Sequence, residues 1–333
     1  MKKLMIIGGS GYVGSLLIET LLSQNLKIFN YDISFFGDEH LPNSNNFTYI
    51  KGDIRNHELM EKTLNENNID TVIHLACISN DPTVILTKDI AEEINYFSFI
   101  DQFRVIKESC VKRFIFASSA SVYGISEEDN VTEENELVPV SQYNIYKAKC
   151  EEIIQKNNEN KLQYIILRPA TICGVSPKMR FDLTVNILTN FAFNKGFIKV
   201  FGGEQFRPNL HIKDMCRLYH KLIFEDWSSF NGKIFNVGFE NLKVKQIAEL
   251  IKKFIFENYK KKIEIKIEES FDNRSYRLNS NKIINEFNFK PQYSVLKAIE
   301  ELCKQFDEGV YKNSFDKNYV NLEVLKNIDL KYK

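Results

Sequence analysis

A tyrosine and a lysine in the middle of the chain form the pattern with the clearest chemistry. Tyr143 and Lys147 are four residues apart, so a helix would place them on one face. A free tyrosine has a pKa of about 10, and a neighbouring ammonium lowers that pKa because it favours the phenolate. The pair could therefore take a proton from a hydroxyl group at neutral pH.

Serine hydroxyls lie upstream of this pair, where a predicted strand ends. The strand Arg113–Ala117 is followed by Ser118, Ser119 and Ser121. Ser119 would share a hydrogen bond with a substrate hydroxyl and orient that hydroxyl toward Tyr143. Taken alone, a Tyr-x-x-x-Lys pair is more often a packing pair and a serine cluster is more often a turn, so both patterns need further context.

A glycine-rich turn near the N-terminus supplies that context. Gly8, Gly11 and Gly14 follow the predicted strand Leu4–Ile7 and open a predicted helix, Gly14–Ser23. Without side chains the backbone can turn sharply and approach a pyrophosphate, which the free N–H groups of the helix N-terminus attract. A tight turn without a ligand is the alternative for glycines alone.

Two aspartates follow the next two predicted strands. Asp32 comes after Lys27–Tyr31 and Asp53 after Thr48–Lys51. Asp32 could accept hydrogen bonds from an adenosine ribose and would repel a 2′-phosphate, which favours NAD over NADP. Asp53 could meet the adenine amino group, although a lone aspartate is more often a turn former. The ordered set of motifs predicts an NAD-dependent enzyme that oxidises a hydroxyl group.

These residues require a sheet whose strands point the same way. Over the first two-thirds of the chain, short apolar runs alternate with helical patterns, which is typical of βαβ units. We therefore predict an α/β fold with a doubly wound parallel sheet of the Rossmann type, which binds ligands at the carboxyl ends of its strands. The remaining strands and helices are predicted at Thr71–His74, Gln163–Leu167, Asn56–Asn67, Ile94–Ser109 and Tyr143–Asn157.

After Pro169 the pattern loosens and predicts a smaller α/β lobe for the substrate. This lobe would comprise mainly residues 169–333, beside an NAD-binding domain of residues 1–168 to which later segments return. The elements expected in it are Phe181–Asn194, Ile198–Phe201, Lys233–Asn236 and Val244–Asn258.

The motifs resemble those of the extended short-chain dehydrogenase/reductase family, in its NAD-dependent epimerase/dehydratase group acting on nucleotide sugars. The resemblance covers nearly the whole chain. It includes His74-Leu75-Ala76, where Cys77 replaces a second alanine, and Arg168-Pro169-Ala170-Thr171 near the nicotinamide. In the second lobe, Ser176–Asp182 and Arg207–Asp214 resemble family segments that hold the nucleotide and its diphosphate.

The resemblance implies a role for each matching position. Ser119, Tyr143 and Lys147 would be catalytic. The positions implied for NAD are Gly8, Gly11, Tyr12, Val13, Gly14, Asp32, Ile33, Asp53, Ile54, Leu75, Ala76, Cys77, Asn95, Ala117, Tyr143, Lys147, Pro169 and Thr171. The positions implied for the nucleotide sugar are Ser79, Asn80, Ser119, Ser121, Arg180, Asn186, Arg207 and Arg274. Arginine suits the diphosphate because its fork binds phosphate oxygens bidentately, but each arginine alone could equally form a surface ion pair.

Members of this group begin with oxidation at a sugar carbon, commonly C4, and differ in the step after it. A 4,6-dehydratase needs an acid and a base beside the tyrosine, and relatives of that type have Thr-Asp-Glu where this chain has Ser119-Ala120-Ser121. The missing carboxylates favour a 4-epimerase, in which the keto sugar turns and takes the hydride back on its other face. A carboxylate from elsewhere, such as Asp81, leaves dehydration open.

Three other interpretations use the same motifs. A C4 dehydrogenase would release a keto sugar and NADH, and a reductase would run the reverse step, although Asp32 argues against an NADPH-linked one. The loop Ser176–Asp182 resembles a subgroup from surface-polysaccharide and heptose gene sets, where dehydrogenases and epimerases both occur. A non-catalytic NAD sensor is disfavoured because such relatives generally lose the tyrosine or the lysine.

Composition limits the partners and the compartment. Lys plus Arg and Asp plus Glu each total 44, so no overall charge attracts nucleic acid or an anionic membrane. No apolar run approaches the roughly 18 residues of a membrane span. The six cysteines form no C-x-x-C pair, which indicates reduced thiols and no metal site. We therefore expect a cytoplasmic protein. The family resemblance further implies a nucleotide-diphosphate sugar as substrate and a homodimer, because Ile94–Ser109 and Tyr143–Asn157 resemble the helices that pair into the dimer interface of the family.

Overall fold

The largest element of the computed structural model, which describes residues 1–126, 128–156, 161–269, 275–326 and 328, is a seven-stranded sheet. All neighbouring strands are parallel, in the order β3-β2-β1-β4-β5-β6-β10. This is the order of a doubly wound sheet with one strand added beside β6. The strands are β1 (Lys2–Ile7), β2 (Leu26–Asp32), β3 (Phe47–Lys51), β4 (Thr71–His74), β5 (Arg113–Ala117), β6 (Gln163–Pro169) and β10 (Lys233–Val237).

Both faces of this sheet are buried. In β1, Leu4 and Ile6 pack into one apolar cluster, while Met5 and Ile7 pack into another. Successive side chains of a strand point to opposite faces, so the two clusters lie on opposite sides of the sheet. A strand that is apolar on both faces is typical of a parallel sheet between two layers of helices. The predicted doubly wound α/β fold is confirmed.

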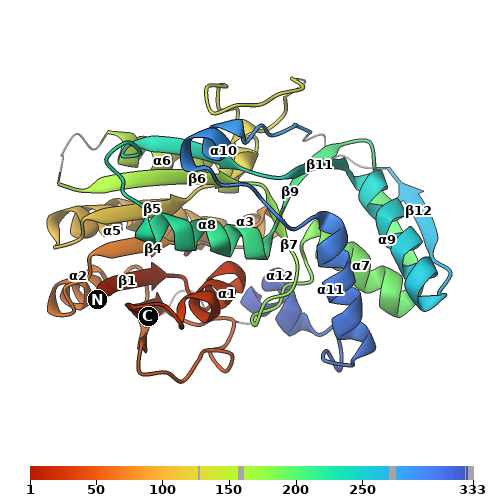
Figure 1. The fold of residues 1–333 in the computed structure, drawn as a ribbon, viewed down its shortest axis with the longest axis horizontal. Coiled ribbons are helices and arrows are strands. Elements are labelled where there is room, and N and C mark those ends of the chain that lie inside the picture. The colour runs from red at the N-terminus through yellow and green to blue at the C-terminus, as the bar shows by residue number, and fades with distance from the viewer. Residues whose placement is uncertain (127, 157–160, 270–274, 327, 329–333) are drawn as a thin grey trace.

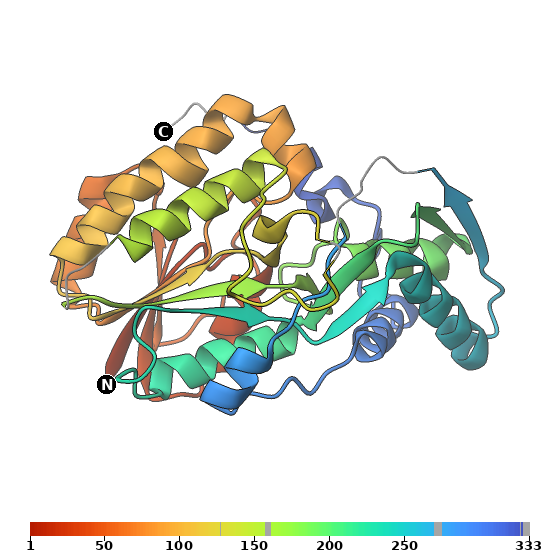
Figure 2. The same cartoon turned by 90° about the horizontal axis from the view of Figure 1, so that it is seen from above.

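Helices cover the two faces. On one face α1 (Tyr12–Leu21) contacts α8 (Ile212–Phe224). Figure 2 shows α8 on the opposite side of the sheet from α5 (Ser98–Glu108) and α6 (Gln142–Gln155). The helix α2 (His57–Glu66) packs against α5. Buried residues recur every three or four positions along α8, so a single stripe of that helix faces the core.

A second lobe lies at one end of the large sheet (Figures 1 and 2). It holds a three-stranded sheet, β11-β9-β7, a two-stranded sheet, β12-β8, and three helices that contact one another. The core is continuous between the lobes, because Leu4 and Ile299 belong to one apolar cluster. The elements are β7 (Thr171–Cys173), α7 (Thr184–Lys195), β8 (Phe197–Phe201), β9 (Phe206–His211), β11 (Glu240–Lys243), α9 (Val244–Tyr259), β12 (Glu264–Glu268) and α11 (Val295–Asp307).

Short helical elements connect these parts. A π-helical turn, η1, leads directly into α5, so the helix predicted over 94–109 begins in that turn. The short elements are α3 (Asp81–Leu86), α4 (Lys88–Glu92), η1 (Glu93–Phe97), η2 (Ala120–Tyr123), α10 (Asn281–Phe287), η3 (Lys317–Tyr319) and α12 (Asn321–Leu325).

The strand predicted over Lys233–Asn236 does not belong to the second lobe. It lies in β10, which pairs in parallel with β6 so that Ile234 is beside Ile166 and extends the large sheet. Phe235 and Val237 are buried there. Parallel strands are joined by long connections, so position in the sequence does not say which sheet a late strand will join.

Candidate active site

A cavity of about 370 Å³ lies at the carboxyl ends of the large sheet. The residues that follow β1, β2, β4, β5 and β6 line it, and the second lobe closes one side. Every position predicted for NAD lies in its wall except Asn95. Ser119, Tyr143 and Lys147 lie in the same wall, so the structure brings the three catalytic candidates together with the glycine turn.

The glycine turn has no room for side chains at two of its positions. Gly8 has a φ of +86°, and a Cβ atom there would lie 2.5 Å from the backbone nitrogen of Ala76. A Cβ atom on Gly14 would lie 2.5 Å from the Cα of Gly9. The turn therefore holds the start of α1 tightly against the ends of β1 and β4.

The start of α1 is open to an anion. Its N-cap is Gly11, no side chain caps the helix, and its first turn contains no acidic residue. The first N–H groups of a helix have no partner within it and carry the positive end of the helix dipole. Gly11 lines the cavity, so these N–H groups face it and can hold a pyrophosphate, as a dinucleotide site requires.

Asp32 ends β2 at the cavity wall. Its two carboxylate oxygens accept hydrogen bonds from the N–H groups of Ser10 (2.9 Å) and Ser34 (2.7 Å). Burial raises the pKa of Asp32, and these two hydrogen bonds oppose that rise. The carboxylate is thus fixed in place beside the glycine turn, where the sequence predicts a ribose contact.

Asp53 also lies in the cavity wall, but its carboxylate is already paired with an arginine. The guanidinium of Arg55 lies 2.6 Å from one of its carboxylate oxygens, in a pair that is mostly buried. Asn95 lies behind the wall: its amide accepts the N–H of Ile78 (2.8 Å) and donates to the carbonyl of the same residue (2.9 Å). Asn95 thus holds the loop after β4 in place.

Lys147 fastens α6 to the sheet. Its ammonium donates a hydrogen bond to the carbonyl of Ala117 at the end of β5 (2.7 Å) and lies 5.9 Å from the centre of the Tyr143 ring. The hydroxyl of Ser119 is 2.7 Å from that of Ser121. Ser121 in turn donates to the side-chain oxygen of Asn144, so it supports Ser119 and does not itself line the cavity.

The surroundings of Tyr143 keep its phenol protonated. Burial raises the pKa of Tyr143 well above its ordinary value, and the nearby Cys77 and Asp81 raise it further, while Arg180 lowers it. At neutral pH the protein's own groups therefore hold a neutral tyrosine. Additional positive charge beside the phenol is needed before it can act as a base.

A buried ion pair between Glu151 and Arg168 connects α6 to the large sheet. Glu151 follows Lys147 by four residues on α6, so Tyr143, Lys147 and Glu151 share one helix face. Its carboxylate accepts hydrogen bonds from Arg168 Nε (3.1 Å) and from a terminal guanidinium nitrogen (2.6 Å). Ser118 also donates to it. The pair thus joins α6 to the ends of β5 and β6, next to Ser119.

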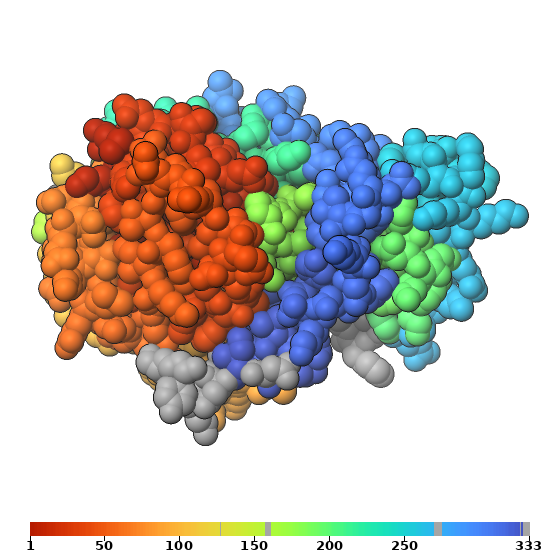
Figure 3. Space-filling view, turned by 90° about the horizontal axis from the view of Figure 1, so that it is seen from below, coloured from red at the N-terminus to blue at the C-terminus, as the bar shows by residue number. Residues whose placement is uncertain are grey.

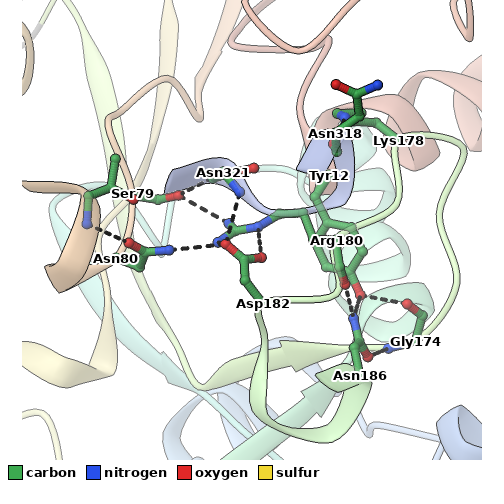
Figure 4. Close-up of polar contacts among 11 residues, drawn as sticks. Tyr12, Ser79, Asn80, Gly174, Lys178, Arg180, Asp182, Asn186, Asn318 and Asn321 are labelled. Carbon is green, nitrogen blue, oxygen red and sulfur yellow. Dashed lines mark hydrogen bonds and ion pairs between the residues drawn. The ribbon is translucent and has the colours of Figure 1, made fainter. Parts of the chain in front are cut away.

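The substrate side of the cavity is built around Arg180 (Figure 4). Its guanidinium binds the carboxylate of Asp182 through two contacts, of 2.8 and 3.0 Å, and donates to Ser79 (3.0 Å). Asn80 donates to the same carboxylate (3.1 Å). Arg180, Ser79 and Asn80 all line the cavity, as Tyr143 does, and the charge of Arg180 lowers the pKa of Tyr143.

Among the described residues, three positions predicted for the substrate do not line the cavity: Ser121, Asn186 and Arg207. Asn186 is fully buried and binds the N–H of Gly174 (3.0 Å), the hydroxyl of Tyr12 (3.1 Å) and the carbonyl of Arg180 (2.9 Å), as Figure 4 shows. It therefore supports the loop that carries Arg180. Arg207 lies on β9 and donates to the carbonyl of Phe206 (3.1 Å), outside the cavity wall as Ser121 is. Arg274 lies outside the described residues.

Several residues of the cavity wall were not among the positions predicted from the sequence. Lys178 could have been suspected, because it lies in the segment that resembles the nucleotide-binding loop. The others are apolar or lie far away in the sequence, and only the fold brings them to the site. These wall residues are Phe35, Phe36, Lys178, Leu183, Met215, Tyr219, Asn321 and Leu325.

The described part of the chain contains no cluster of three or more histidine, cysteine or acidic side chains arranged to bind a metal ion. Within the same residues, no helix is both long enough and apolar enough to cross a membrane.

Comparisons with known proteins agree with this geometry. A family model described as "NAD dependent epimerase/dehydratase family" matches residues 4–238. A UDP-glucose 4-epimerase of Halalkalibacterium halodurans is 24% identical over 320 residues, covering 90% of this chain and 93% of that protein.

Solved structures are similar over both lobes. A UDP-glucose 4-epimerase from Thermotoga maritima, solved with UDP-glucose, has a TM-score of 0.82 at 22% identity, covering 92% of this chain and 99% of that one. A dTDP-glucose 4,6-dehydratase from Bacillus anthracis, solved with NAD, has a TM-score of 0.79 at 20% identity, covering 93% and 98%.

Proposed function

The chain belongs to the NAD-dependent epimerase/dehydratase family, and from that premise we propose that it is a nucleotide-sugar 4-epimerase. The observation that carries the proposal is the convergence of Ser119, Tyr143 and Lys147 on one wall of the cavity that also holds the glycine turn and Asp32. Such a site can oxidise a sugar hydroxyl and then reduce the ketone.

The residues present fit NAD. The N–H groups at the start of α1 would hold its pyrophosphate, and Asp32 would bind the adenosine ribose. Ile54 and Leu75 would form apolar walls for the cofactor, and Lys147 would reach the nicotinamide ribose. When bound, NAD supplies the hydride acceptor and a positive charge.

The protein's own part in the reaction is the movement of a proton. The phenolic oxygen of Tyr143 would take the proton of the sugar hydroxyl, and Ser119 Oγ would hold that hydroxyl in line. Burial opposes this step by raising the pKa of Tyr143. The ammonium of Lys147 is held by the Ala117 carbonyl 5.9 Å from the centre of the ring, and together with the positive charge of bound NAD it would favour the phenolate.

The absence of carboxylates after β5 favours epimerisation over dehydration. Ala120 is buried, and Ser121 is engaged with Ser119 and Asn144. Dehydration is the second candidate, because Asp81 directly follows the cavity residue Asn80, although Asp81 itself does not line the cavity. A C4 dehydrogenase or a keto-sugar reductase would use the same three residues and would differ only in its net products.

The proposal extends to the partners and the setting. The substrate would be a nucleotide-diphosphate sugar, with Arg180, Ser79 and Asn80 at the reacting end of the cavity. The six free thiols support a reducing, cytoplasmic setting. The helix pair α5 and α6, preceded by the exposed Phe97 of η1, supports a homodimer.

The test mixes the NAD-loaded enzyme with UDP-, GDP-, CDP- and dTDP-sugars and measures reduced-nicotinamide absorbance together with the sugar product. The epimerase proposal expects a sugar inverted at C4 with no net NADH. Accumulation of NADH with a keto sugar would replace it by a dehydrogenase. A product that has lost water would replace it by a dehydratase and would direct attention to Asp81.

A further inference from the structure

The end of the chain returns from the second lobe to the NAD-binding domain. After α11 the chain forms η3 and α12, and α12 contacts α3 of the first domain. Figure 3 shows the blue C-terminal region between the red and orange first domain and the green part of the second lobe. We call Lys317–Leu325 the strap.

Backbone contacts fasten the first part of the strap to the loop after β7. Lys178 Nζ donates a hydrogen bond to the carbonyl of Asn318 (2.8 Å). The N–H of Phe181 donates to the carbonyl of Tyr319 (2.9 Å), and the two rings meet edge to face with their centres 5.1 Å apart. This end of the strap is therefore attached to the second lobe.

The middle of the strap joins the polar group around Arg180 (Figure 4). The N–H of Asn321 donates to Asp182 Oδ2 (3.2 Å), and its side-chain amide donates to Ser79 Oγ (3.4 Å). Ser79 belongs to the first domain and Asp182 to the second lobe. Asn321 therefore bridges the two parts across the cavity that it lines.

The last residue of the strap closes an apolar patch beside the cavity. Leu325 is 3% exposed and packs with Ile78, Val84 and Ile94. The partly buried Ile54 and Tyr143 pack against the same cluster. The strap therefore lies beside residues of both the predicted adenine contact and the proposed reacting end.

We propose that the strap is a wall of the NAD site, that it must open for the cofactor to exchange, and that it retains NAD between turnovers. The other walls are strand ends, helices and loops, and the loops that carry Asn80 and Arg180 are joined to each other through Asp182. The strap contains no strand, and α12 has five residues, so it can detach while the continuous core stays intact. The proposal rests on the family's cofactor and is independent of the epimerase reaction.

The test measures release of NADH, whose fluorescence reports binding, after mixing the loaded protein with excess NAD. We would compare Leu325→Ala and a chain ending at Asp316 with Leu296→Ala, a matched change at an exposed leucine of α11 outside the cavity wall. Loss of part of a buried leucine predicts release about tenfold faster for Leu325→Ala, and faster still for the shortened chain. The control should stay within about twofold of the parent.

Thermal unfolding of each loaded variant separates loss of the strap from loss of the fold. Faster release from a variant that unfolds at the parent's temperature supports the proposal. Unchanged release from folded Leu325→Ala and from the folded shortened chain would overturn it. If the shortened chain does not fold, Leu325→Ala decides alone. No sugar is present, so a failed epimerase assay leaves this result intact.

Discussion

At the residue scale, two tyrosines of α6 differ in their expected roles: Tyr143 is the proposed base, and Tyr146 packs in the interior. Tyr143 lines the cavity beside Lys147, whereas Tyr146 is buried on the same helix. Among the described residues, the hydroxyl of Tyr146 has no hydrogen-bond partner. The same substitution at the two positions therefore removes a proposed base in one case and an unused hydroxyl in the other.

We predict that Tyr143→Phe lowers turnover by a factor of about 10³, the usual contribution of a positioned general base. Tyr146→Phe should leave turnover within about twofold, because no hydrogen bond is lost. Product formation by the NAD-loaded variants measures both, and NADH fluorescence checks that each variant is loaded with cofactor. Full activity of Tyr143→Phe would remove the tyrosine from the reaction.

The buried pair Glu151–Arg168 gives a prediction about stability. Removing one partner leaves a buried charge uncompensated, so Glu151→Leu should cost about 3–5 kcal/mol of unfolding free energy. Adding Arg168→Met should recover much of that loss, because a buried ion pair can be replaced by packed apolar side chains. Urea unfolding measures both changes.

Glu152→Gln is the matched control, since Glu152 lies next to Glu151 on α6 but is exposed and pairs with Lys156. Its effect should be below about 1 kcal/mol. A Glu151→Leu protein as stable as the control would show that the pair does not hold the helix. The double variant also removes the carboxylate to which Ser118 donates. Because Ser118 is adjacent to Ser119, we expect this variant to regain stability without regaining full turnover.

At the element scale, the sequence predicts what depends on local pattern. The strands β4 and β5 match their predicted ranges to the residue, because their apolar runs are short and bounded by polar residues. The orientation of loop residues is a different matter. The motif positions of Asn95 and Asn186 predict contacts with ligands, yet their amides bind loop backbone behind the cavity wall. Spacing along the chain fixes where a residue lies, not which side of a loop it faces.

A contact between elements predicts an acid-sensitive link. Glu301 of α11 lies 2.7 Å from the ammonium of Lys213 at the start of α8 and 3.4 Å from Nε2 of His211 at the end of β9. Burial alone would raise the pKa of Glu301, but its contacts with His211 and Lys213 outweigh burial and lower that pKa to about 2. The folded protein therefore binds this proton more weakly than the unfolded chain does.

The pH dependence of stability takes its sign from that difference. The link stabilises the fold above the ordinary pKa of Glu301, about 4.5, and its contribution is lost as pH falls toward about 2. Glu301→Gln should lower the unfolding free energy at pH 7 by up to about 3 kcal/mol and flatten its decline in that acid range. Urea unfolding at several pH values tests this. Glu300→Gln, at an exposed neighbour, should change neither the unfolding free energy at pH 7 nor its decline in acid. If the unfolding free energy of Glu301→Gln declines in acid as steeply as that of the parent, Glu301 is not the group responsible.

At the scale of the whole molecule, the cavity is assembled from both ends of the chain. Gly11 and Leu325 line the same space although more than three hundred residues separate them. The motifs predict the first domain and the catalytic group, because parallel strands bring their carboxyl ends to one edge. They do not predict the strap or the placement of β10, since both depend on long-range packing that leaves no period in the sequence.

The last prediction concerns assembly. Phe97 of η1 is 53% exposed and Ile100 of α5 is 42% exposed, and exposed apolar side chains on neighbouring helical turns are typical of an interface. We predict a homodimer paired through this surface. The change Phe97→Asp combined with Ile100→Asp should place charges in the interface and weaken dimerisation by about a hundredfold or more.

Light scattering during size-exclusion chromatography, over a range of protein concentrations, measures this directly. Phe256→Asp is the control, because Phe256 is 51% exposed on α9 in the second lobe, away from η1 and α5. The parent and the control should have twice the mass of the double variant at the same concentration. A monomeric parent, or a double variant that remains dimeric, would show that another surface, or none, joins two copies of the chain. NADH release from the double variant should stay at the parent's rate, because neither Phe97 nor Ile100 lines the cavity.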